Sequence, residues 1–324
     1  MKGFFMVSLH RCFSFVVTFS LALSGIAPVT AQDTKSLPTD TQALVRINIQ
    51  SLINSSLAKS MGIDQAKEML NAGLPGTEIL KELGFDPFKD LHSVTIAAPG
   101  GNENEKGLIL VSGNFNSKKL NAKAGEQAKD KKDQIKTHDV SGKVVYELKM
   151  PEQQVPLFVV IANDNAIMAS PDKDYLTKAM NGKDGKPANK DFNKLVEDLD
   201  PKLGISIAVV SGALAMKNLP DPAKAILENV DSIGGGIGID KDIVLKLSIN
   251  TKTDDSAKML QETINQGLTQ ALGFLGLMAA QQKELAPALE FVKSLKVENK
   301  AKSITIQGML AGKALEDAVK EKTK

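Results

Sequence analysis

The sequence has no tryptophan, two tyrosines and a single cysteine, Cys12. Aromatic rings are the surfaces on which bases and sugars stack, and here they make up 4% of the residues. The chain after Cys12 has no thiol for a disulfide, a thiolate metal site or a cysteine nucleophile. The fold must therefore be stabilised by its hydrophobic core.

Arginine is also scarce, because Arg46 is the only one after Arg11. Without Lys2 and Arg11, the chain carries 38 basic and 38 acidic residues and is formally neutral. A neutral chain lacks the basic surface that nucleic acid requires, and few guanidinium groups disfavour phosphate-rich ligands. We therefore expect no nucleic-acid partner.

The first 31 residues are typical of a cleavable secretory signal peptide. Two basic residues precede an uncharged apolar run from Phe13 to Ile26, and Pro28 ends that run. Small or β-branched residues then occupy the −3 and −1 positions of a cleavage site after Ala31. An uncleaved membrane anchor is the alternative, since the uncharged stretch approaches spanning length. We expect export to the periplasm or the exterior after cleavage near Ala31–Gln32, with no transmembrane span in the mature chain.

Hydrophobic periodicity and turn residues divide the rest of the chain into strands and helices. We expect strands at 43–49, 93–98, 107–115, 143–149, 156–162, 166–169, 204–210, 232–239, 242–250 and 303–309. We expect helices at 51–83 and 213–230, each with a break, and at 116–131, 172–180, 253–281 and 313–320. The predicted fold class is α+β, with two related modules, each a mainly antiparallel sheet with helices packed on one face. The predicted domains are the signal peptide 1–31, a first module 32–182, a linker 183–189 and a second module 190–324.

Both halves follow a β-α-β-β-α-β-α order, with an extra hairpin strand in the first. The period of roughly 150 residues indicates a duplicated domain and not a solenoid. Separately, the segment Leu37-Pro38-Thr39-Asp40-Thr41 resembles the opening of a group of exported bacterial proteins of unknown function. The resemblance extends from Leu37 to Ala179, and it implies export and paired α+β modules. It implies no activity and no site residues.

Two Ser-x-x-Lys motifs, Ser56 to Lys59 and Ser170 to Lys173, have the spacing at which a lysine amine activates a serine. Enzymes of that type also need a Lys-Thr-Gly element, which the chain lacks. A Ser-Lys hydrolase is therefore kept only as the second alternative, and it requires one serine to lie in a cleft beside a lysine of depressed pKa. We expect no enzyme and no catalytic residue.

The other patterns predict structure rather than chemistry. His92 and His138 lie in different segments without a histidine partner, so we expect no metal site. The pairs Asp172/Asp174, Asp198/Asp200 and Asp240/Asp242 lack the remaining ligands of a calcium loop and instead suggest helix caps and turns. The glycines of 234–238 lack dinucleotide spacing, so we expect no cofactor and interpret them as sites of close helix packing or of a bulge.

The stretch 267–280 is the most apolar part of the chain after the signal, and it is too short to span a bilayer. A helix that is apolar on most sides is normally buried. Its other interpretation is a helix that faces a lipid or a partner. Its candidate ligand-facing residues are Leu268, Leu272, Phe274, Leu275 and Met278.

These patterns favour a non-catalytic exported envelope protein that acts by binding or scaffolding. Its partner would be an envelope protein or polymer, and the lysine-rich segment 118–136 could contact anionic polymers, although its interspersed acids favour a solvated face. The alternative is a carrier of an apolar or lipid-like small molecule, held between a sheet and the 267–280 helix. A carrier requires an enclosed apolar pocket, which a scaffold does not need.

Overall fold

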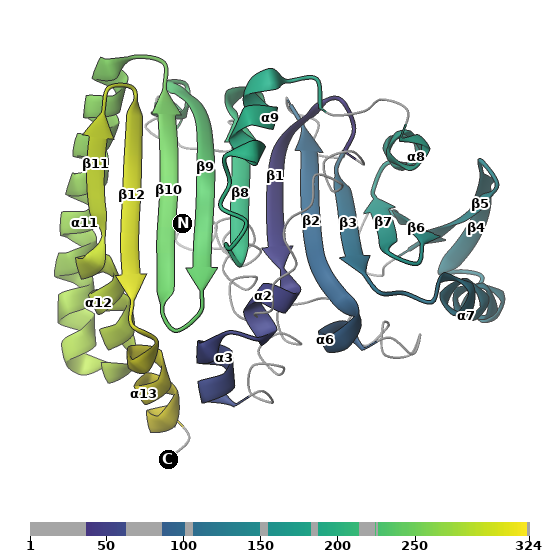
Figure 1. Ribbon diagram of the computed structural model, residues 1–324, viewed down its shortest axis with the longest axis horizontal. Coiled ribbons are helices and arrows are strands. Elements are labelled where there is room, and N and C mark those ends of the chain that lie inside the picture. The colour runs from purple at the N-terminus through teal and green to yellow at the C-terminus, as the bar shows by residue number, and fades with distance from the viewer. Residues whose placement is uncertain are drawn as a thin grey trace, which may run out of the picture.

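The computed structural model describes residues 37–62, 86–100, 106–149, 155–182, 187–213, 224 and 226–322. The predicted signal peptide, most of the predicted helix 51–83, part of the predicted helix 213–230 and residues 183–186 of the predicted linker lie outside these residues. The described part of the chain forms one antiparallel sheet of twelve strands with helices on both faces (Figure 1). The α+β class is therefore confirmed.

Element bounds follow the chain in two groups. Residues up to 182 form β1 (Thr41–Asn48), α2 (Ile49–Ile53), α3 (Ser56–Met61), α6 (Pro87–Asp90), β2 (Leu91–Pro99), β3 (Leu108–Gly113), α7 (Ser117–Asp130), β4 (Ile135–Val140), β5 (Lys143–Leu148), β6 (Leu157–Asn163), β7 (Ala166–Ser170) and α8 (Lys173–Asn181). Later residues form α9 (Lys190–Glu197), β8 (Ile205–Val210), β9 (Val230–Ile239), β10 (Ile243–Thr251), α11 (Asp254–Gln281), α12 (Ala286–Ser294), β11 (Lys296–Lys300), β12 (Ser303–Leu310) and α13 (Gly312–Lys322).

The two halves of the sheet have the same order of strands when each is followed outward from the centre. From β1 it runs β1-β2-β3-β7-β6, and from β8 it runs β8-β9-β10-β12-β11, with the hairpin β5-β4 extending the first half. The two halves meet where β1 pairs with β8, from Ala43 opposite Val209 to Ile47 opposite Ile205. The predicted modules thus contribute to one continuous sheet, while the division at 183–189 stays a prediction.

The central strands carry buried apolar side chains on both faces, so helices cover both faces. On one face, which we call the α9 face, Leu44 lies beside Ala97 and Ala208, and α8 and α9 pack over them. On the other, the α11 face, Ile47 and Val94 pack with α2 and α7, and Ile304 packs with α11 farther along. The expectation of helices on one face is corrected here, because alternation along these strands leaves apolar side chains on both sides.

Side-chain hydrogen bonds cap the helices that were predicted to begin near residues 116, 172 and 253. Asn116 accepts from the backbone N–H of Lys119 at 2.9 Å, Asp172 from Tyr175 at 2.8 Å, and Thr253 from Ser256 at 3.0 Å. Short polar side chains satisfy the free amides of a first helical turn in this way.

Five elements were not predicted: β4, β11, α6, α9 and α12. The two strands form the two edges of the sheet and are rich in charge, with the sequences IKTHDV and KVENK. Charged edge strands resist pairing with other chains, and they also lack the apolar alternation by which a strand is recognised.

Candidate functional site

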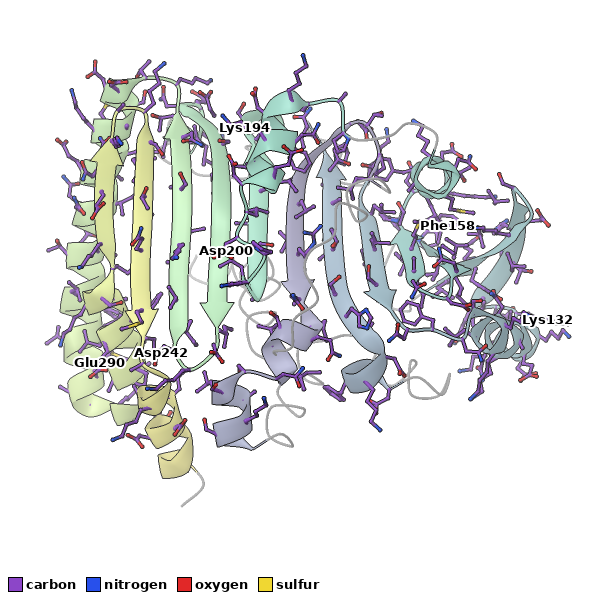
Figure 2. The ribbon with its side chains drawn as sticks, in the orientation of Figure 1. Lys132, Phe158, Lys194, Asp200, Asp242 and Glu290 are labelled. Carbon is purple, nitrogen blue, oxygen red and sulfur yellow. The ribbon has the colours of Figure 1, made fainter. Side chains whose placement is uncertain are left out.

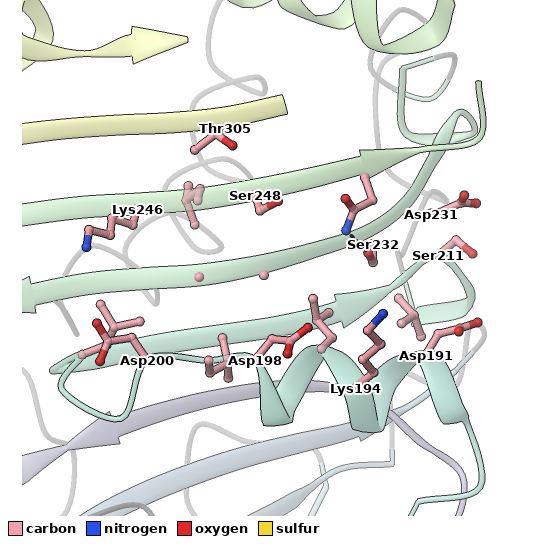
Figure 3. A pocket seen from close by; sticks show the side chains of 18 of the residues that line it. Asp191, Lys194, Asp198, Asp200, Ser211, Asp231, Ser232, Lys246, Ser248 and Thr305 are labelled. Atoms are coloured by element: carbon pink, nitrogen blue, oxygen red, sulfur yellow. Dashed lines mark hydrogen bonds between the residues drawn. The ribbon is translucent and has the colours of Figure 1, made fainter. Parts of the chain in front are cut away.

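Helix α9 is held on the sheet by one buried aromatic ring. Asn189 caps the helix by accepting from the N–H groups of Asp191 and Phe192, both at 3.0 Å. The Phe192 side chain is fully buried in the core of the α9 face. The opposite side of the helix therefore presents Asp191, Lys194 and Asp198 along one edge (Figure 3).

Strand β9 lies beside α9 and contributes almost no side chains to the α9 face. Gly234, Gly236 and Gly238 occupy alternate positions of that strand, so they share the face. A Cβ on Gly234 would lie 2.5 Å from Cδ1 of Leu195, so the glycine lets α9 pack closely on the sheet. The predicted close packing of a helix is confirmed at Gly234, and the missing side chains hollow the face into a groove.

Beyond the glycines the sheet surface is polar and no described helix covers it. Ser248 of β10 lies between Gly234 of β9 and Thr305 of β12 in one row across the sheet. The Asn250 amide donates to Oγ of Ser232 at 2.9 Å. The opposite face of the same strands packs against α11 through Ile249 and Ile304.

The groove has a volume of about 880 Å³. Its charged lining residues are four aspartates and two lysines: Asp191, Asp198, Asp200, Asp231, Lys194 and Lys246. Its floor adds hydroxyl and amide groups from Ser232, Ser248, Asn250, Thr305 and Gln307, and the lining contains no aromatic ring and no histidine. Such a surface can form many hydrogen bonds with a neutral or cationic polar ligand but offers no nucleophile with a histidine base.

Neither predicted serine lies in this groove. The Ser56 hydroxyl is exposed and donates to Oδ1 of Asp240 at 3.0 Å, and the Ser56 backbone N–H donates to the same oxygen at 3.1 Å. These two bonds hold the pKa of Asp240 below its ordinary value. Ser170 is fully buried and its Oγ accepts from the N–H of Asp172.

The histidines and acidic pairs are dispersed. His138 lies 2.8 Å from the Glu147 carboxylate, and this hydrogen bond lowers the pKa of Glu147. His92 lies on β2, at the other side of the first half. Asp172 is the cap of α8, and Asp240 lies in the β9–β10 turn, as predicted. Within the described ranges, no three histidine, cysteine or acidic side chains are grouped to hold a metal ion.

The apolar helix segment 267–280 forms the second half of α11 and is not buried as expected. Leu268, Leu272, Leu275 and Met278 are half-buried, whereas Phe274 is 64% and Leu277 is 74% exposed. The helix is buried only in its first two turns, at Ser256, Ala257 and Leu260. Among the described helices, none is long and apolar enough to cross a membrane.

The groove itself was not predicted from the sequence. Its signal is present in β10, where Lys246, Ser248 and Asn250 alternate with apolar residues. That alternation predicts one polar face, but one strand does not show that its neighbours are polar on the same side. Only the register with β9 and β12 brings the polar positions together.

No protein-family model and no curated protein matches the chain. Two solved structures of TP0453 are similar in fold. Crystal form III has a TM-score of 0.48 and 10% sequence identity, with 91% of this chain and 98% of that chain covered. Crystal form I has a TM-score of 0.46 and 10% identity, with 91% and 97% covered. At this identity and these TM-scores, the likeness assigns neither a function nor a site to this chain.

Proposed function

We propose that this chain is a non-catalytic exported protein, periplasmic or secreted, that acts by binding. We further propose that it binds a polar ligand in the groove between α9 and the open sheet surface of β9, β10 and β12. The export part of the proposal rests on the N-terminal sequence, and the binding part rests on the groove. No residue of the groove is assigned a catalytic role.

The observation that carries the proposal is the contrast between the two halves of the sheet. In the first half, the α9 face is covered, with Leu108, Leu110 and Met168 buried beneath α8. In the second half, the strands at matching positions of the strand order present Ser248 and Thr305 to solvent. Helix α13 follows β12 as α8 follows β7, but it contacts α12 and α3 and leaves this face open (Figure 1).

The lining chemistry defines the class of ligand. Hydroxyl and amide groups on a flat floor, with aspartates in excess over lysines along the wall, favour a ligand rich in hydroxyl or amide groups and without net negative charge. A volume of about 880 Å³ suits a ligand of several sugar-sized or peptide-sized units.

Native mass spectrometry of the full chain, expressed with its own N-terminal segment and purified from an envelope fraction, tests the proposal. We expect a co-purifying polar molecule in stoichiometric amount, and we expect Thr305→Trp to remove it by filling the groove. Thr269→Trp, on the exposed side of α11, is the matched control and should retain the molecule. A wild-type chain without bound mass, or an equal amount on the Thr305→Trp variant, would overturn the groove assignment.

A carrier of an apolar ligand is the second candidate, and the incomplete burial of α11 favours it. Residues 267–280 do not line the α9 groove. The carrier therefore has to hold its ligand against the exposed Phe274 and Leu277. Lipid extraction of the same preparation separates the two candidates, because a carrier would yield an apolar molecule that Phe274→Ser/Leu277→Ser removes and Thr305→Trp does not.

A further inference from the structure

A second hollow lies at the other end of the molecule, between α7 and the sheet. Its volume is about 1000 Å³. One side is a stripe of α7 at a spacing of four residues: Ser117, Asn121, Gly125 and Lys129. The other side is formed by β4, β5 and β6. Residues of this hollow are absent from the lining of the α9 groove, so the two are separate.

The hollow is an open space that the helix could have filled. A Cβ on Gly125 would meet no atom within 4 Å. Glycine in the middle of a helix costs about 1 kcal/mol relative to alanine, and here no close packing requires it. Val144, on the facing strand, is 43% exposed. The helix therefore leaves apolar sheet surface uncovered at this point.

The floor of the hollow is amphipathic and fixed. Val144, Tyr146 and Ile161 contribute its apolar surface. The Tyr146 hydroxyl donates to the backbone oxygen of Asn121 at 3.1 Å, which ties the sheet to α7. Burial raises the pKa of Tyr146, so this phenol stays neutral and keeps its donor.

The residues that line the hollow include basic side chains but no acidic ones. Lys129, Lys132, Lys136, Lys143 and His138 are among its lining residues. On β4, Lys136 and His138 lie opposite Glu147 and Val145, so their side chains are on the other face of the sheet from Tyr146. Lys129 and Lys132 are therefore the cations that a ligand in the hollow would meet. Lys143 donates to the backbone oxygen of Ala162 at 2.9 Å. Among the described residues, Lys129 and Lys132 pair with no carboxylate, and Lys132 lies in the turn that follows α7 (Figure 2).

Two carboxylates lie near the hollow: Asp164 at its Ser117 end, and Asp139, which lies opposite Val144 on β4. Asp164 accepts from the N–H and the hydroxyl of Ser117 at 2.9 and 2.6 Å, and these bonds lower its pKa. An anionic group would therefore be repelled from the Ser117 end and attracted to the lysine end. Lysine acts as a point charge, so the site needs no arginine to bind a carboxylate.

We propose that this hollow binds an organic anion with a short apolar body, of the class of a medium-chain carboxylate. Its carboxylate lies beside Lys129 and Lys132, and its apolar body lies against Val144, Tyr146 and Ile161. This site is independent of the α9 groove, and neither proposal depends on the other.

The test is isothermal titration calorimetry of the full chain with decanoate, 1-decanol and decyltrimethylammonium, which share one tail and differ in charge. We expect saturable binding of one decanoate per chain and weaker binding of the other two. Lys129→Glu/Lys132→Glu should weaken decanoate binding about tenfold, equal to about 1.4 kcal/mol. Both lysines are exposed, so this variant is expected to fold.

Two substitutions at Gly125 locate the bound tail. Gly125→Trp should abolish binding by filling the hollow, and Gly125→Ala should retain it. Phe274→Ser/Leu277→Ser is the control for adsorption of the tail to exposed α11, and it should bind decanoate as the wild type does. The proposal is wrong if decanoate does not bind saturably, if the ammonium binds as tightly, or if both the double lysine reversal and a folded Gly125→Trp leave binding unchanged.

Discussion

At the scale of single residues, the glycines of β9 decide how closely α9 approaches the sheet. Gly234 lies under Leu195, whereas a Cβ on Gly238 would have only ordinary contacts, the nearest at 3.9 Å. The two glycines share one strand and one face. They therefore form a matched pair in which packing against α9 is the main difference.

We expect Gly234→Val to destabilise the chain by about 1–3 kcal/mol, because its side chain must displace Leu195 from a packed position. Gly238→Val should change stability little, since the space is open and valine favours strands. Urea unfolding followed by far-ultraviolet circular dichroism measures both. Equal losses in the two variants would show that α9 does not depend on the close approach at Gly234.

Two aspartates each accept two hydrogen bonds from the serine at the start of a helix. Asp240 accepts from the N–H and the hydroxyl of Ser56, and Asp164 accepts from the same two groups of Ser117. Both have a lowered pKa in the folded chain. A folded-state pKa below the unfolded value of about 3.9 gives a stabilisation that is present above that pH. It is lost as the pH falls through the lowered folded-state value.

We therefore expect the wild-type chain to lose more stability than Asp240→Asn when the pH falls from about 5 to about 2. The asparagine still accepts a hydrogen bond but has no proton to gain. Urea midpoints across this pH range give the comparison, with Asp133→Asn, in an exposed turn, as the control. If the pH profiles of wild type and Asp240→Asn coincide, the hydrogen bonds at Asp240 do not couple its protonation to folding.

At the scale of elements, α11 combines a packed beginning with an exposed apolar end. Its first turns fix it to the sheet through Ala257 and Leu260. Beyond these turns, the helix was expected to be buried because apolar residues occupy most of its sides. Instead, Phe274 and Leu277 are exposed. Composition shows that a helix can be buried, but it does not show which other elements pack against each of its turns.

We expect Phe274→Ser/Leu277→Ser to change the free energy of unfolding by no more than about 0.5 kcal/mol per residue, because both side chains are already in water. Leu260→Ala should cost about 2–5 kcal/mol, since it opens a cavity against the sheet. Urea unfolding at constant protein concentration distinguishes these outcomes. A large loss in the double variant would mean that these side chains are covered in solution, by another part of the chain or by a second copy.

At the scale of the whole molecule, the sequence predicted the α+β class and most strands, because alternation and turn residues are local signals. It did not predict that Val45 would pair with Ile207, or that the halves would form one sheet. That pairing joins segments far apart in the chain, and no local pattern in either strand specifies its partner. The α9 groove was missed for the same reason, because Ser248 and Thr305 become neighbours only through the register.

The shared sheet predicts that both halves unfold together. Separating them would break the β1–β8 ladder and expose Leu44 and Ala208, which are buried at the junction.

The unfolding of the first half can be measured by itself, because the chain has no tryptophan and both tyrosines, Tyr146 and Tyr175, lie in that half. Tyrosine fluorescence therefore reports the first half alone, and far-ultraviolet circular dichroism reports the whole sheet. We expect the two urea transitions to coincide in midpoint and slope, as in a single cooperative unit. Two separated transitions would instead mean that the halves are stable independently and that the β1–β8 ladder joins two folding domains.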